Sequence, residues 1–69
     1  MYEVMLSTDT TIGRVQKCLS ELEPKAMWSE YNAKKRMLVV DSTNSNISDI
    51  KGTLFATIGV DFIDDIREI

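Results

Sequence analysis

Residues 2–22 read YEVML-STDTT-IGRVQKCLSEL, and the change of hydrophobic period within them decides the fold. Apolar side chains recur at every second position from Tyr2 to Leu6, which is the period of a half-buried strand. Residues 7–11 are polar and rich in helix-capping side chains. Beyond them the apolar positions recur every three or four residues up to Leu22, and this spacing lines one face of a helix. Pro24 cannot continue that helix, so the segment predicts a strand followed by a helix.

The middle of the chain predicts a hairpin. Ala26 to Tyr31 alternates as a second strand, and Arg36 to Asp41 contains the clearest strand of the sequence, Met37-Leu38-Val39-Val40. Asn32-Ala33-Lys34-Lys35 between them is a plausible turn. A polar loop is expected over Ser42 to Ser45.

The last third predicts a helix and a strand. Asn46 can cap the helix, and Asp49 in its first turn suits the helix dipole. Gly59 fits the position just past the helix end. Val60 to Ile69 has a mixed pattern, with some spacings typical of a helix and others of a strand. We assign it as a strand because two helices need a sheet to cover.

The resulting element order predicts one α+β domain over residues 1–69. It is a ferredoxin-like βαββαβ two-layer sandwich, with a four-stranded antiparallel sheet and both helices on one face. Right-handed crossovers place the first and third strands in the centre. A 69-residue chain buries only about 60% of its unfolded surface, which favours a dimer or a bound partner over an isolated monomer.

Composition argues against several classes of function. The net charge of −3 and the scattered Lys and Arg residues speak against nucleic acid as a partner. The chain has no histidine, and no nucleophile–base pair or phosphate loop can be assembled, so we expect neither an enzyme nor a cofactor. No apolar run is long enough for a membrane span. The single cysteine, Cys18, suits a reducing cytoplasm, and its helical spacing favours a place in the core.

The chain resembles the heavy-metal-associated domain family, which includes small copper chaperones and the N-terminal modules of copper-transporting ATPases. The resemblance runs over nearly the whole chain and is best from Leu6 to Glu23. Apolar residues there fall at the family's first-helix core spacing, namely Val15, Cys18, Leu19 and Leu22. The resemblance implies the ferredoxin-like fold and the transport of a soft metal ion.

The motif that would carry soft-metal binding is missing. The family's Met-x-Cys-x-x-Cys loop corresponds here to residues 6–11, where Thr8 and Thr11 occupy the cysteine positions and Leu6 that of the methionine. A threonine hydroxyl is neutral and hard, and it does not replace a thiolate as a ligand for Cu(I). We therefore expect no thiolate metal site.

Two polar clusters have alternative readings. The loop Thr8, Asp9, Thr10 and Thr11 precedes a helix, so it could bind a metal or a small anion, or it could simply cap the helix. The acidic residues near the end of the chain could bind a hard cation or keep an edge strand solvated; they are Asp61, Asp64, Asp65 and Glu68. We favour a helix cap for the loop and a solvated edge strand for the acidic residues.

The sheet face opposite the helices is the best candidate for an interface. If Leu38 and Val40 face the helices, alternation sends Met5, Met37 and Val39 outward, and Ile63 extends the set on the last strand. Trp28 joins them if Tyr31 points inward, whereas a one-residue slip in that strand would bury Trp28 beneath the helices. A contiguous apolar patch on an uncovered face marks an interaction site. The sequence thus predicts a non-enzymatic binding or assembly module that meets a protein partner or a second copy of itself. The alternative is a metal or small-anion carrier that uses the Thr8–Thr11 loop.

Overall fold

The elements of the chain were determined from a computed structural model, which describes residues 1–42 and 46–69. In chain order they are β1 (Tyr2–Leu6), α1 (Ile12–Leu22), β2 (Trp28–Asn32), β3 (Met37–Asp41), α2 (Ile47–Thr57), a 3-10 turn η1 (Val60–Phe62) and β4 (Ile63–Glu68). The predicted α+β, ferredoxin-like order is confirmed. Most of the polar loop expected over residues 42–45 lies outside the described residues.

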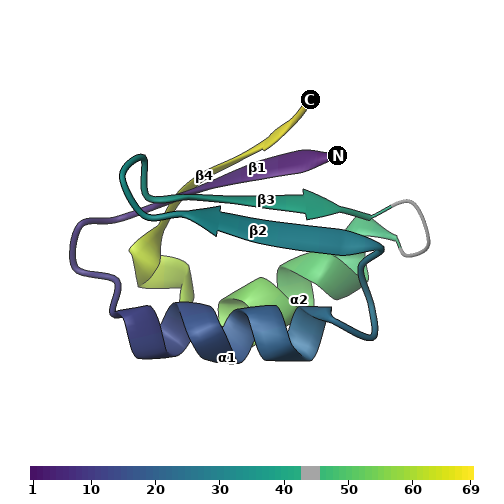
Figure 1. Cartoon of the computed structure of the whole chain (residues 1–69), viewed down its shortest axis with the longest axis horizontal. Coiled ribbons are helices and arrows are strands. Elements are labelled where there is room, and N and C mark those ends of the chain that lie inside the picture. The colour runs from purple at the N-terminus through teal and green to yellow at the C-terminus, as the bar shows by residue number, and fades with distance from the viewer. Residues whose placement is uncertain (43–45) are drawn as a thin grey trace.

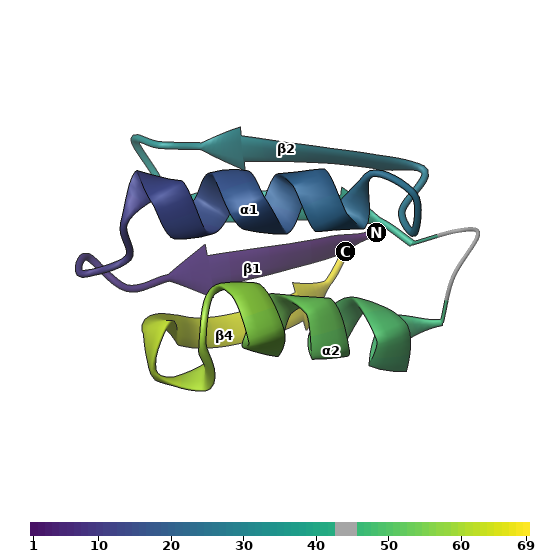
Figure 2. The same cartoon turned by 90° about the horizontal axis from the view of Figure 1, so that it is seen from below.

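The sheet has the strand order β2-β3-β1-β4, with all neighbours antiparallel. β1 and β3 occupy the centre, as the crossover rule predicts. Both helices lie on the same side of the sheet, and the other side carries no further layer of the described chain (Figure 1). Seen from the helix side, α1 runs beside β2, and α2 lies over β4 (Figure 2). By the strand order, β2 and β4 are the two edges of the sheet.

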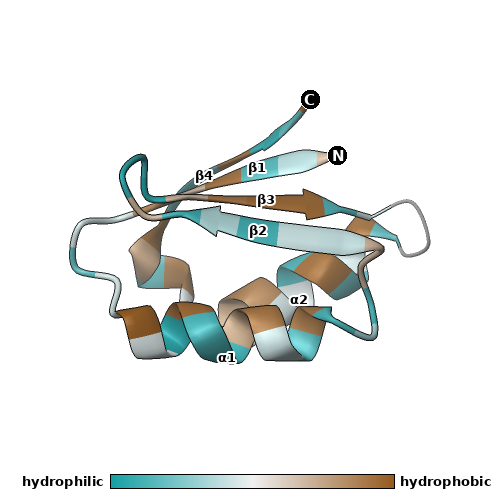
Figure 3. Ribbon diagram, in the orientation of Figure 1, coloured by the Kyte–Doolittle hydropathy of each residue, from teal (hydrophilic) through white to brown (hydrophobic). Residues whose placement is uncertain are grey.

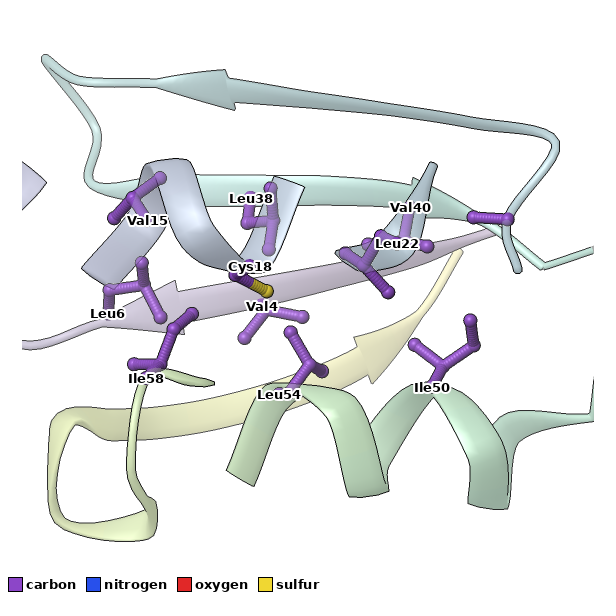
Figure 4. Packing of buried hydrophobic residues seen from close by; sticks show 11 residues of the cluster. Val4, Leu6, Val15, Cys18, Leu22, Leu38, Val40, Ile50, Leu54 and Ile58 are labelled. Carbon is purple, nitrogen blue, oxygen red and sulfur yellow. The ribbon is translucent and has the colours of Figure 1, made fainter. Parts of the chain in front are cut away.

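The core lies between the sheet and the helices. Val4, Leu38 and Val40 from the central strands are fully buried. They meet buried side chains of both helices, which converge on the same layer in Figure 4: Val15, Cys18, Leu22, Ile50, Leu54 and Ile58. In Figure 3 the apolar colour follows β3 and the inner helix surfaces, while β2 and the end of β4 are polar. This distribution is typical of a half-covered antiparallel sheet.

Both helices begin at the capping residues that the sequence indicates. The side chain of Thr11 accepts a hydrogen bond from the backbone N–H of Arg14, and that of Asn46 accepts one from the N–H of Asp49 at 3.0 Å. Such bonds satisfy backbone donors that the first helical turn leaves without partners. The capping signals therefore place both helix starts correctly.

Several element boundaries differ from the prediction by one or more residues, and two of the differences are the largest. β2 begins at Trp28 rather than Ala26, because the N–H of Ala26 donates to the carbonyl of Leu22 and is thereby held at the end of α1. The last segment is a strand only from Ile63 onward. Residues 60–62 form a 3-10 turn, closed by a bond from the Phe62 N–H to the carbonyl of Gly59.

Arg14 joins the start of α1 to the end of α2, a contact that periodicity does not reveal. Its Nη1 donates to the carbonyl of Ile58 at 2.9 Å, and its guanidinium lies 4.8 Å from the centre of the Phe62 ring. A cation close to the last carbonyls of a helix interacts favourably with them. Gly59 permits this packing, since its φ is +100° and a Cβ there would lie 3.3 Å from the Phe62 ring.

We expect Gly59→Ala to lower the free energy of unfolding by about 1–2 kcal/mol, because alanine strongly disfavours this backbone geometry. Urea denaturation followed by circular dichroism measures the change. Gly52→Ala is the matched control, since Gly52 lies within α2 and a Cβ there meets nothing within 4 Å. We expect that control to gain about 0.5–1 kcal/mol. Equal effects of the two substitutions would contradict the strain assigned to Gly59.

Candidate protein-binding surface

The uncovered sheet face is defined by the strand register. Residues paired directly across an antiparallel sheet point to the same side, and neighbours along a strand point to opposite sides. Leu38 and Val40 are buried under the helices, so their neighbours on β3 point outward. With their partners on the other strands, the outward residues are Glu3, Met5, Trp28, Glu30, Asn32, Met37, Val39, Asp41, Asp65 and Arg67.

An apolar strip crosses the middle of this face. Met5 lies directly opposite Met37, and Val39 follows on the same side of β3. Trp28 is opposite Asp41 and therefore diagonally across from Val39. A large aromatic ring can span that separation. The Trp28 side chain is 45% exposed although it is the largest in the chain. The alternation thus assigned these four residues to the correct face, and their role as an interface remains a prediction.

Ile63 does not extend the strip. It pairs with Leu6 and packs against the core from the helix side. The cause is an irregularity in the β1–β4 pairing: Met5 pairs with Asp65 and Leu6 with Ile63, so one extra residue of β4 lies between the two pairs. Such a bulge reverses the inward and outward positions beyond it. The expectation for Ile63 was wrong because strict alternation cannot reveal a bulge.

The strip is bordered by carboxylates. Glu30 and Glu3 lie on either side of Val39 in one cross-strand row, and Asp65 lies beside Met5. Arg67 is the single cation among the outward residues, and its Nε contacts Asp65 Oδ2 at 3.0 Å in an exposed ion pair. The uncovered face is therefore apolar in the centre and acidic at its border. Sequence reasoning named the apolar residues and missed this border, although it follows from the same alternation.

Two hydroxyls of the Thr8–Thr11 loop form hydrogen bonds within the fold. The Thr11 hydroxyl caps α1, and the Thr10 hydroxyl donates to the carbonyl of Phe62 at 3.4 Å. The Asp9 N–H donates to the hydroxyl of Ser7. These bonds describe a turn that connects β1 to α1 and holds it against η1. These hydrogen bonds occupy the hydroxyls of Thr10 and Thr11, whereas Thr8 and Asp9 are exposed.

The acidic residues near the end of the chain are dispersed. Asp65 pairs with Arg67, and Glu68 accepts a hydrogen bond from the Tyr2 hydroxyl at 3.0 Å, which raises the pKa of Tyr2. Over residues 1–42 and 46–69, no group of three or more Asp, Glu, Cys or His side chains is arranged to hold a metal ion. The charges on β4 act as separate surface groups.

Cys18 is fully buried in the core between the two helices. Burial raises the pKa of its thiol, the hydrogen-bonding contact with Thr57 acts in the opposite direction, and the nearby charge of Glu21 raises the pKa further. The neutral thiol is therefore the form that the fold stabilises.

We expect Cys18 to resist a thiol reagent at pH 8 in the folded protein and to react at once in urea, because the thiolate is the reacting species. Because the pKa of the Cys18 thiol is raised in the folded state, its contribution to the free energy of unfolding is fully present below the usual pKa of about 8.5. That contribution is lost as the pH rises through the folded-state pKa. Reaction kinetics with a chromogenic disulfide measure the first effect. Rapid reaction of the native protein would contradict the buried position.

Comparison with protein-family models, curated protein sequences and solved structures found no match to this chain. In the part of the chain that the structure describes, neither helix is long and apolar enough to cross a bilayer.

Proposed function

We propose that this domain is a non-enzymatic protein-binding module that docks a partner on its uncovered sheet face. The observation that carries the proposal is Trp28, a large aromatic side chain held 45% exposed on a face that no helix of the described chain covers. Tryptophan is the residue type most enriched among those that dominate binding energy. In this proposal the chain is a relative of the heavy-metal-associated domains that lacks the thiolate site.

The charge pattern specifies the chemistry of the partner. Glu3, Glu30 and Asp65 lie beside the apolar strip, and among the outward residues that the structure describes Arg67 is the single cation. A second copy docked face to face would bring acidic borders together, and opposed like charges are destabilising. A partner with an apolar centre and Lys or Arg residues around it would complement both features. We therefore propose a basic, partly apolar partner surface in preference to a homodimer.

Partner recovery on the immobilised domain tests the proposal. We expect the Trp28→Ala, Met37→Ala double variant to lose proteins that the wild type retains, because it removes the largest side chain of the strip and one of its two methionines. We also expect retention to weaken as salt is raised, since ionic contacts at the border are screened. The matched control is Ile12→Ala, Phe55→Ala, which removes two exposed apolar side chains on the helices.

The pattern across the variants decides the outcome. Binding that survives in the helix variant and disappears in the sheet variant supports the proposal. Equal recovery by both variants, or a face-to-face homodimer detected by light scattering of the wild type, contradicts it.

A further inference from the structure

The two edges of the sheet differ in how they are protected. β4 carries charges at four of its six positions and has a bulge against β1. These are devices by which proteins prevent an edge strand from pairing with another chain. β2 has the sequence WSEYN, in which Glu30 is the only charge, and its pairing with β3 is regular throughout. Of the two edges, β2 is the one that has a single charge and no bulge.

The register identifies the backbone groups of β2 that point away from β3, at the free edge of the sheet. The N–H of Leu6 donates to the carbonyl of Arg36, so alternate residues of β3 from Arg36 onward direct their backbone groups toward β1. Met37, Val39 and Asp41 therefore face β2, in agreement with the bond from the Met27 N–H to the Asp41 carbonyl.

Their partners on β2 are Asn32, Glu30 and Trp28. By the same alternation, the backbone N–H and C=O groups of Ser29 and Tyr31 point away from β3, in the plane of the sheet. An antiparallel strand laid along β2 could satisfy all of these groups.

Two hollows lie along this edge. One, of about 310 Å³, is bounded by the second half of α1 and the start of β2, and its lining residues are Leu19, Glu23, Ala26, Met27, Trp28 and Ser29. The other, of about 340 Å³, lies at the opposite end of the strand and is lined by residues 30–34. Met27 in the first hollow is 58% exposed. A strand added to β2 would direct alternate side chains toward the helix side, where the first hollow offers an apolar surface.

Charge decides which strand can occupy the edge. If two copies paired through β2 in the register that joins Ser29 of each to Tyr31 of the other, Glu30 of both copies would lie directly opposite each other. Like charges at directly opposed positions are destabilising. A lysine or arginine opposite Glu30 would instead form a favourable cross-strand pair, and Glu23 in the first hollow adds a second negative charge.

We propose that the partner contributes an extended segment that pairs with the free edge of β2. This segment places an apolar side chain in the first hollow, beside Leu19 and Met27, and a basic side chain opposite Glu30. This inference rests on the proposed function and specifies how the partner is bound. Trp28 is thus a residue of the uncovered face that also borders this hollow, so the two surfaces adjoin at the start of β2.

A blocked eight-residue peptide of alternating valine and lysine tests the proposal by titration into isotopically labelled protein. We expect amide shifts concentrated in residues 27–32 and slower hydrogen exchange at Ser29 and Tyr31. Ser29→Pro removes an outward N–H and puts a ring at the edge, so we expect affinity to fall about tenfold. Glu68→Pro makes the matching change on β4, where the N–H also points outward by the same alternation, and we expect it to leave affinity within about twofold of wild type.

Charge reversal provides a second test that leaves the β2 backbone unchanged. We expect Glu30→Lys to weaken binding of the lysine peptide and to strengthen binding of a peptide with glutamate in place of lysine. No binding to the wild type, unaltered affinity in Ser29→Pro, or a dimer that pairs through β2 would overturn the inference. The proposed function fails separately, if partner recovery is insensitive to the Trp28 and Met37 substitutions.

Discussion

Leu54→Ala is expected to unfold a large fraction of the protein at room temperature. Leu54 is fully buried where α2 meets the sheet, beside Cys18 and Ile58 in the core layer of Figure 4. Replacing a buried leucine with alanine costs about 2–5 kcal/mol, from lost transfer free energy and from the cavity left behind. A single core of this size rarely supplies more than about 3–5 kcal/mol in total. The substitution therefore removes most of the stability, which urea denaturation at several temperatures measures directly.

The neighbouring residue provides the control. Phe55 has a larger side chain than Leu54 but is 42% exposed on the outer surface of α2. We expect Phe55→Ala to change the free energy of unfolding by less than about 1 kcal/mol, as surface substitutions usually do. If Phe55→Ala lowered the free energy of unfolding more than Leu54→Ala, the opposite face of α2 would have to pack against the sheet, which would contradict the structure.

Trp28→Ala is expected to separate binding from stability. Its ring stands on the uncovered face, so truncation creates no cavity in the core. At a docking surface, an anchoring tryptophan contributes about 2 kcal/mol or more, which corresponds to roughly a thirtyfold loss of affinity. We expect that loss for any partner recovered on the wild type, with the free energy of unfolding changed by less than about 1 kcal/mol.

Calorimetric titration of the recovered partner, alongside urea denaturation of the free variant, measures both quantities. Phe55→Ala again serves as the control, since it removes an aromatic side chain of similar exposure from the helix side. A Trp28→Ala variant that unfolds but binds normally when folded would show that the residue is structural.

Local chemical signals in the sequence were sufficient to predict much of the fold. Thr11 and Asn46 mark the helix starts because their side chains can accept bonds from exposed N–H groups, and Pro24 stops α1 because it cannot continue a helix. The alternation of Met37, Leu38, Val39 and Val40 also gave the correct inward and outward faces of β3. These features depend on residues close together in the chain.

The errors concern features set by tertiary contacts. The bulge between β1 and β4 places Ile63 on the helix side, and no pattern within β4 alone reveals it. The late start of β2 is the exception, since it depends on a local bond from the Ala26 N–H to the carbonyl of Leu22, four residues earlier. The Arg14 contact with Phe62 joins residues that only the finished fold brings together. The acidic border of the uncovered face, by contrast, follows from the same alternation that assigns the apolar residues to that face.

The fluorescence of Trp28 tests the central claim most directly, because it is the only tryptophan in the chain. Emission and quenching by acrylamide can be measured on the free protein and again in the presence of a recovered partner. We predict that the free indole is readily quenched, and that the partner shifts its emission to shorter wavelength and shields it. An indole that is equally accessible with and without a bound partner would show that the partner binds elsewhere, and would contradict the account.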